Sequence, residues 1–160
     1  MSNFRRSWSR VGARAVLPQQ QAFSNNYLYS AVAPLSGDDF HLIGLANMNT
    51  DTEKLFLTEL KKKHPNQEVV VVFDNAPCHR PKALRAIPGL TIIHLPSYSP
   101  ELNPVERYFE EMRRATADEL FTTMETLEER LTDAINRWTP ETLKQLCGYE
   151  WIRAQLGEVN

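Results

Sequence analysis

The residues best suited to chemistry in this 160-residue sequence are two carboxylates, Asp74 and Glu106. Asp74 ends the run VVVVFD, and Glu106 lies in the segment NPVERYF. Two carboxylates on separate rigid elements form a hard-oxygen site suited to Mg²⁺, which keeps several waters and takes phosphate oxygens as further ligands. Paired divalent ions can activate a water or a 3′-hydroxyl and stabilise the leaving oxygen of a phosphodiester. If the two side chains converge, Asp74 and Glu106 could therefore hold metal ions for phosphodiester chemistry.

Both carboxylates also have a purely structural interpretation. Asp-Asn-Ala-Pro is good turn chemistry, so Asp74 could serve only to cap the turn after its strand. Asn103 is a plausible helix N-cap, with Pro104 at the first helical position and Glu106 at the third, which matches a capping box. The two interpretations of Glu106 are compatible, because a capped first turn fixes the direction of its side chain.

Other chemistries fit the same residues less well. A phosphate-handling enzyme of the haloacid dehalogenase type, with Asp74 as nucleophile, would need a second aspartate at position 76, which is alanine. Cys78 and His79 could bind zinc together with His94, but adjacent ligands without a second pair argue against it. The absence of a GxGxxG sequence argues against a dinucleotide-binding fold.

The elements that must position these carboxylates follow from the apolar pattern. The β-branched run ending at Phe73 predicts a central, parallel strand, and chemistry gathers at the carboxyl ends of such strands. A helix from about Pro104 to Ala117 carries Glu106. Further strands are predicted at 25–35, 40–48 and 90–95, and further helices after the capping segment 49–52 and at 81–87, 126–138 and 139–146. The first of these helices is expected to end at the lysines 61–63 before Pro65, and the last to begin with Thr139 as its cap and Pro140 at its first position. This order predicts one α/β domain over residues 1–160 with a mixed sheet.

Composition and charge set limits on the class of protein. Hydrophobic residues make up 42% and charged residues 24% of the chain, which is typical of a globular domain. No apolar run is long enough to span a membrane, and two cysteines make no disulfide framework, which fits a reducing cytoplasm. The net charge is −2, but residues 1–114 carry +3 and residues 115–160 carry −5. A basic arm can be merely solvated or can contact DNA phosphates. The candidate DNA contacts are Arg5, Arg6, Arg10, Arg14, Arg80 and Lys82.

Two segments carry a family resemblance. FDNAPCH, followed by HLPSYSPELNPVERYFEEMRR, resembles the DDE transposases of the mariner-like superfamily, in the bacterial insertion-sequence branch. The match extends upstream through WSRVGARAVLP and YLYSAVAPLSGDDFHL, so it spans nearly the whole chain. The resemblance implies a ribonuclease-H-like mixed sheet flanked by helices. It also implies two Mg²⁺ or Mn²⁺ ions held by three carboxylates, which cleave the transposon ends and join them to target DNA.

Within this resemblance, Asp74 corresponds to the second carboxylate and Glu106 to the third, with 31 residues between them. Asn75, His79 and Asn103 match the family motif as supporting residues. Asn75 and His79 would orient Asp74 or a metal-bound water, although His79 could equally be a structural histidine at a helix start.

The sequence departs from the family at the first carboxylate. That aspartate is expected on a strand before FRRSWSRVG, yet no Asp or Glu precedes Asp38, and Asp38 and Asp39 fall in a predicted hairpin turn. The resemblance then implies that the first central strand and the helix-turn-helix region are absent, leaving a gap between the hairpin and the Val69 strand. We expect the isolated chain to be inactive, and to need a second copy or a missing N-terminal transposase portion. The alternative is an inactive remnant that binds DNA or a partner transposase. Either protein would act on DNA in the bacterial cytoplasm, associated with the nucleoid.

Overall fold

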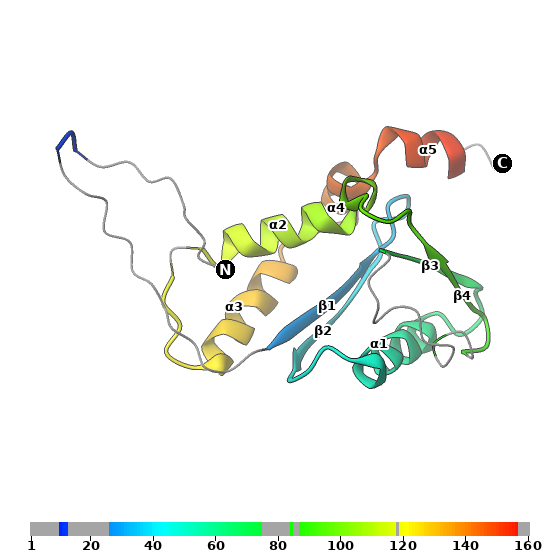
Figure 1. Cartoon of the computed structure of the whole chain (residues 1–160), viewed down its shortest axis with the longest axis horizontal. Helices are drawn as coiled ribbons and strands as arrows, with labels where there is room; N and C mark the ends of the chain where they lie inside the picture. The colour runs from blue at the N-terminus through cyan, green and yellow to red at the C-terminus, as the bar shows by residue number, and fades with distance from the viewer. Residues whose placement is uncertain (1–9, 13–25, 75–83, 85–86, 118, 157–160) are drawn as a thin grey trace.

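The computed structural model describes residues 10–12, 26–74, 84, 87–117 and 119–156. The described part has an α/β fold with two short sheets and five α-helices (Figure 1). In chain order the elements are β1 (Tyr27–Val32), β2 (Asp39–Leu45), α1 (Thr50–Lys63), β3 (Val69–Phe73), β4 (Leu90–His94), the 3₁₀ helix η3 (Pro100–Leu102), α2 (Val105–Ala115), α3 (Met124–Ile135), α4 (Pro140–Cys147) and α5 (Glu150–Leu156).

The strands form two separate pairs. β1 and β2 make the predicted antiparallel hairpin, and β3 and β4 pair in parallel from Val69↔Leu90 to Phe73↔His94. Within the described residues no backbone ladder joins the two pairs, so the single mixed sheet that the sequence predicts is not formed there. Each pair is a local unit, a hairpin or a parallel crossover. Within the described residues, this separation agrees with the gap that the family resemblance implies between the hairpin and the Val69 strand.

The hairpin lies between two apolar cores because side chains of a strand alternate between its faces. Tyr29 of β1 packs toward Leu57 of α1, whereas Val32 packs toward Tyr108 of α2. Figure 1 shows α1 on one side of the hairpin and α2 and α3 on the other. The first core contains Phe56, Leu57, Leu60, Leu84 and Leu90, and the second contains Tyr108, Met112, Ala134, Leu143 and Cys147.

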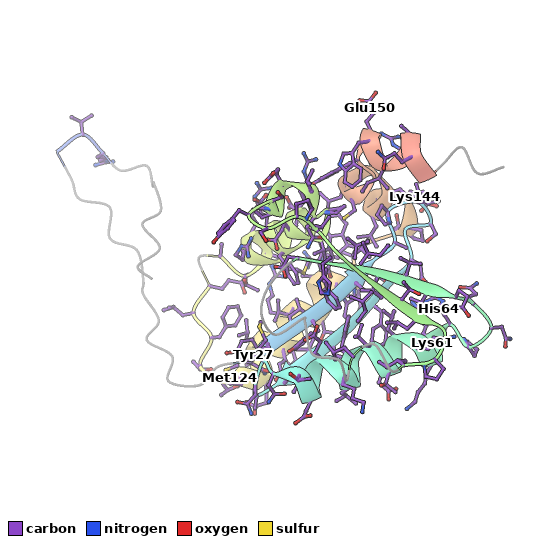
Figure 2. All side chains as sticks on the ribbon, turned by 45° about the vertical axis from the view of Figure 1, so that its right-hand side comes forward. Tyr27, Lys61, His64, Met124, Lys144 and Glu150 are labelled. Atoms are coloured by element: carbon purple, nitrogen blue, oxygen red, sulfur yellow. The ribbon has the colours of Figure 1, made fainter. Side chains whose placement is uncertain are left out.

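The ends of α1 are fixed as the sequence predicts. The Asn49 side chain accepts hydrogen bonds from the first turn and completes a capping box. At the other end the Lys61 ammonium donates to the carbonyls of His64, Pro65 and Gln67, at 2.9, 3.1 and 2.9 Å. Figure 2 shows Lys61 and His64 beside the turn into β3. A lysine here both complements the helix dipole and fixes the chain before the strand.

The helical part agrees with the predicted apolar stripes and caps. Thr139 caps α4 with Pro140 at the first position, as predicted. α3 begins at Met124 after a Thr123 cap, two residues earlier than predicted, and α5 was not predicted. The predicted helix at 81–87 lies outside the described residues, apart from two single positions. No helix in the described ranges is long and apolar enough to cross a bilayer.

Two further features of these cores bear on the site. Cys147 is fully buried, its thiol donates to the Pro104 carbonyl at 3.5 Å, and burial raises its pKa to about 11.

On β3 and β4, Val70, Val72 and Ile93 are exposed, because alternate side chains point away from the α1 core. The β3–β4 pair is thus covered by helix on one face only within the described part.

Candidate functional site

Asp74 lies where the sequence predicts, directly after β3 at the carboxyl end of the parallel pair. It is half-buried. The end of β4 is attached to the same edge, since the Leu95 N–H donates to the Phe73 carbonyl at 2.7 Å. His94 Nδ1 lies 3.4 Å from the Asp74 carbonyl oxygen. The carbonyl groups of Phe73 and Asp74 are therefore both held, by Leu95 and by His94 respectively.

A proline-rich connector, residues 95–104, leads from this edge to α2. Its prolines, at 96, 100 and 104, restrict the backbone to few conformations. Asn103 is buried, with 9% of its surface exposed, and its side-chain oxygen accepts from the Val105 N–H at 3.3 Å. The Asn103 N–H donates to the Pro100 carbonyl at 3.0 Å. Asn103 therefore holds the connector and the start of α2 together.

Glu106 lies in the first turn of α2 and is half-buried. The predicted capping box is wrong, because the backbone N–H of Asn103 that Glu106 would bind already donates to Pro100. The Glu106 N–H donates to the Asn103 carbonyl at 3.1 Å, which fixes its backbone. Within the described residues its carboxylate has no hydrogen bond or ion pair. A first-turn carboxylate is nonetheless favoured by the helix dipole.

The helix that carries Glu106 is anchored to the hairpin through Tyr108. Tyr108 is completely buried, and its ring stacks on His41 with centroids 5.1 Å apart and planes 12° apart. Its hydroxyl lies 3.4 Å from His41 Nε2. The same nitrogen lies 3.0 Å from an Asp39 carboxylate oxygen, and His41 Nδ1 lies 2.9 Å from the Ser30 hydroxyl. A neutral histidine with its proton on Nε2 satisfies these contacts. The sequence pattern places Tyr108 in an apolar stripe, and nothing in it signals this polar network.

Burial governs the protonation of this network. It lowers the pKa of His41, although the hydrogen bond and charge of Asp39 oppose the change. It also raises the pKa of the Tyr108 phenol, with the Asp39 charge adding to the effect. Both side chains are therefore neutral near pH 7, and the network is a positioning device for α2.

Asp38 and Asp39 do not belong to the edge that carries Asp74. Asp38 bonds Lys63 at 2.6 Å and His64 at 3.1 Å, both at the end of α1. Partial burial alone would raise the pKa of Asp38, but the hydrogen bond and charge of Lys63, with the His64 charge, lower it overall. The composition predicts Asp39 in the hairpin turn, and this prediction is wrong, because Asp39 is the first residue of β2. The Asp38 carboxylate ties the hairpin to the end of α1, whereas the Asp39 carboxylate bonds His41 within the hairpin.

Several predicted site residues cannot be placed. Asn75, Cys78, His79, Arg80 and Lys82 follow Asp74 outside the described residues, as do Arg5, Arg6 and Arg14 before the hairpin. Arg10 is described and exposed. Among the described residues, no three His, Cys, Asp or Glu side chains gather closely enough to hold a metal ion.

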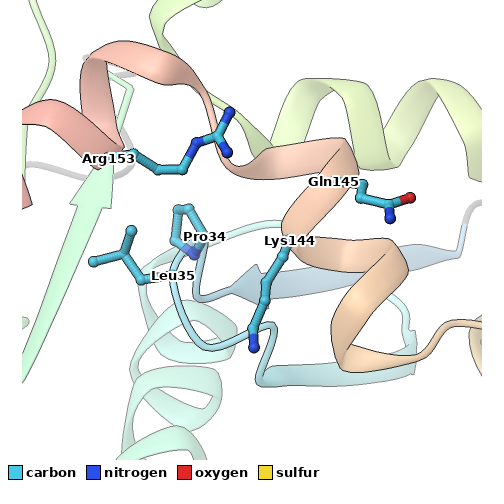
Figure 3. Close-up of a pocket in the computed structure, with 5 residues that line it drawn as sticks. All are labelled: Pro34, Leu35, Lys144, Gln145 and Arg153. Carbon is cyan, nitrogen blue, oxygen red and sulfur yellow. The ribbon is translucent and has the colours of Figure 1, made fainter. Parts of the chain in front are cut away.

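Two further features were not singled out from the sequence. Tyr98, in the connector, is fully exposed and has a φ of 60°. A separate pocket of about 340 Å³ opens between the hairpin turn and the last two helices (Figure 3). Pro34, Leu35, Lys144, Gln145 and Arg153 line it. Its two cations suit an anion and not a metal ion, and it contains none of the predicted site residues.

Comparison with known proteins gives a family and a fold. The family model described as DDE superfamily endonuclease matches residues 1–128. The uncharacterized protein y4pE/y4sA of Sinorhizobium fredii (strain NBRC 101917 / NGR234) is 32% identical over 88 residues, which cover 54% of this chain and 64% of that protein. The chain therefore spans less than two thirds of that curated relative.

Two solved structures have a similar fold. The Mos1 transposase paired-end complex with left transposon end has a TM-score of 0.71 and 20% identity, covering 94% of this chain and 48% of that chain. The Mos1 Strand Transfer Complex has a TM-score of 0.67 and 18% identity, covering 94% and 47%. At this level of identity the likeness establishes the fold, and this chain corresponds to about half of either Mos1 chain.

Proposed function

This chain belongs to the DDE superfamily endonuclease family, and from that premise we propose that it is the catalytic-domain portion of a transposase that cleaves and joins DNA strands. The observation that carries the proposal is that the backbone around both carboxylates is held in place by hydrogen bonds and prolines. Asp74 follows β3, the end of β4 is bonded to the same edge, and the proline-rich connector leads to Glu106 in the first turn of α2. Phosphodiester chemistry needs acidic side chains held on rigid elements in this way.

We propose Asp74 and Glu106 as ligands for Mg²⁺ or Mn²⁺. Their donor chemistry fits, because carboxylate oxygens are the ligands that such hard cations take from proteins. When bound, two such ions would supply a nucleophilic oxygen and stabilise the leaving oxygen of the phosphodiester. Asn103 would hold the turn that carries Glu106, and Asn75 and His79 would support Asp74.

A third carboxylate is needed for the proposed two-ion site. No Asp or Glu precedes Asp38, and Asp38 and Asp39 are engaged with α1 and with His41. We propose that the third carboxylate comes with a further strand that lies between the two sheets. Two observations support this strand: a two-stranded pair is marginal alone, and both pairs pack on the α1 core. The chain alone would then be inactive.

DNA is the proposed partner, as transposon end and as target. The printed names of the two Mos1 structures describe transposon-end and strand-transfer complexes of that protein. In this chain the exposed Arg10 and the other basic candidates would contact phosphates. A second copy or a missing N-terminal portion would complete the assembly, in the bacterial cytoplasm beside the nucleoid. A second candidate is a remnant that binds DNA without cutting it, for which the same basic residues would serve.

The test compares two proteins in nicking of a supercoiled plasmid with Mg²⁺ or Mn²⁺. One is the 160-residue chain, and the other carries an added N-terminal strand that ends in aspartate. We expect nicking only by the extended protein, and its loss in Asp74→Ala and Glu106→Ala. Glu101→Ala is the matched control, because Glu101 is an exposed carboxylate in the same connector. Nicking that survives both substitutions contradicts the assignment. Salt-sensitive DNA binding without any nicking by either protein favours the remnant.

A further inference from the structure

Tyr98 combines two properties that folding alone does not favour. Its side chain is fully exposed, so the ring gains nothing from burial. Its φ of 60° lies in the left-handed region, which side chains other than glycine rarely adopt, and no other non-glycine residue in the described ranges has a positive φ. Strained backbone of this kind persists where the surroundings impose it, commonly at ligand sites.

The surroundings of Tyr98 do impose it. Three residues before it, Leu95 is bonded to the edge of β3 at 2.7 Å. Just after it, the Leu102 N–H donates to the Ser99 carbonyl at 3.2 Å, which closes η3. Pro96 and Pro100 stand on either side. The ring is therefore carried on a turn fixed at both ends, on the segment that links the Asp74 edge to Glu106.

We propose that Tyr98 is a stacking platform for an unpaired base of the DNA strand that is cut or joined. This rests on the function proposed above and adds a contact to it. The flat face of a phenol stacks on any base, which gives binding that tolerates sequence. In an intact duplex both faces of a base are covered by its neighbours, so such a ring selects a strand that is frayed, gapped or splayed.

The chemistry of the site explains why an aromatic contact is useful there. Asp74 and Glu106 carry negative charge and repel phosphates until cations neutralise them. An uncharged ring attracts the strand by its base and adds no charge. Stacking is also independent of salt, in contrast to the arginine contacts proposed for the backbone.

The experiment uses the full chain and two DNAs of equal length, an intact duplex and one with a short unpaired stretch that contains 2-aminopurine. Binding is measured by fluorescence anisotropy with Ca²⁺ present, and stacking by quenching of 2-aminopurine. We expect Tyr98→Ala to weaken binding of the unpaired DNA by about 10-fold, as for one lost base stack, and to abolish quenching. Duplex binding and the salt dependence should stay as in the wild type. Tyr98→Phe keeps the ring and should stay within about 2-fold, since stacking needs only the aromatic face.

Two controls separate stacking from folding. Tyr98→Gly removes the ring and relieves the positive φ, so it should lose quenching while its melting temperature is equal or higher. Leu55→Ala removes an exposed apolar side chain from α1 and should change neither signal. Wild-type binding and quenching in Tyr98→Ala and Tyr98→Gly would overturn the stacking role alone. A wild-type chain that binds neither DNA would overturn the proposed function and the stacking role together.

Discussion

The hairpin acids and Glu106 of the proposed site are held in opposite ways. Asp38 and Asp39 each bond cationic or imidazole side chains directly, namely Lys63, His64 and His41. Glu106 is fixed through its backbone, and its carboxylate has no hydrogen bond or ion pair within the described part. The difference indicates that the side chains of Asp38 and Asp39 stabilise the fold through these contacts, whereas that of Glu106 does not. An acid whose backbone is fixed but whose carboxylate is unpaired can give its charge to a ligand.

The substitution with the largest expected effect is Glu106→Gln, which tests whether Glu106 serves metal binding or the stability of the fold. The substitution keeps the volume and the helix but removes the charge. We expect metal-dependent nicking by the extended protein to fall by about 10³-fold or more, because one metal ligand is lost. The melting temperature should fall only slightly, because the favourable charge in the first turn of α2 is lost. A clear loss of stability together with retained nicking would show that Glu106 serves the fold, like the hairpin acids.

Tyr108 tests whether the hairpin network positions the helix that carries Glu106. Tyr108→Ala removes a fully buried ring, and we expect a loss of about 3–5 kcal/mol in the free energy of unfolding. Tyr108→Phe keeps the ring and removes only a 3.4 Å contact with His41, so it should cost about 1 kcal/mol or less. Urea denaturation measures both. Equal costs for the two variants would contradict the packing role.

The two hairpin acids should themselves differ. Asp39→Ala leaves a largely buried histidine, whose side chain is 9% exposed, without its carboxylate, at a cost of about 1–2 kcal/mol. Asp38→Ala removes ion pairs at the surface and should cost under about 1 kcal/mol. The comparison is made by denaturation at pH 7.5. A larger cost for Asp38 would reverse the ranking by burial.

The smallest effect is in the pH dependence of stability. Because burial lowers the pKa of His41, the unfolded chain binds its proton near pH 6.5 and the folded chain only at lower pH. Neutral His41 thus contributes its full share to the free energy of unfolding above about pH 6.5. This share is lost as the pH falls toward the pKa of His41 in the folded chain. The groups around His41 are Ser30, Asp39, Tyr108 and the more distant Lys63.

The measurement is unfolding between pH 7.5 and 5. We expect a decrease of roughly 1 kcal/mol or less, which His41→Gln should reduce. His94→Gln is the control, since His94 lies on the other sheet. The pKa of Asp38 is also lowered, so its stabilising effect is lost only below about pH 4. Asp38 therefore does not affect the change in stability between pH 7.5 and 5. An unchanged pH profile in His41→Gln would contradict the role of burial.

Local signals in the sequence predicted the elements well. The β-branched run gave β3, the lysines and Pro65 gave the end of α1, and Thr139 with Pro140 gave the start of α4. The signals that failed depend on contacts distant in sequence. α5 is only seven residues long and is held by the buried Ile152 and by Arg107, which lies 4.7 Å from the Tyr149 ring.

The candidate site shows the same limit. Asp74 lies at the predicted end of its strand, but α2 begins one residue later than predicted, with Pro104 and not Asn103 as its N-cap. The capping box at Glu106 failed because Pro100 competes for the same N–H. The division into two sheets agrees with the gap that the family resemblance implies, whereas the strand patterns alone specify faces and not neighbours. The positive φ of Tyr98 could not be predicted from the sequence, because tyrosine rarely adopts this conformation.

The thiol of Cys147 makes the start of α2 observable by chemistry. It contacts the Pro104 carbonyl, two residues before Glu106, and is sealed inside the helical core. A thiol-reactive reagent can modify it only when α4 separates from this turn, so the rate of labelling in a Cys78→Ser background measures how often that opening occurs. Cations or DNA that bind at Glu106 and hold the turn closed should slow that labelling, which would report ligand binding without any cleavage.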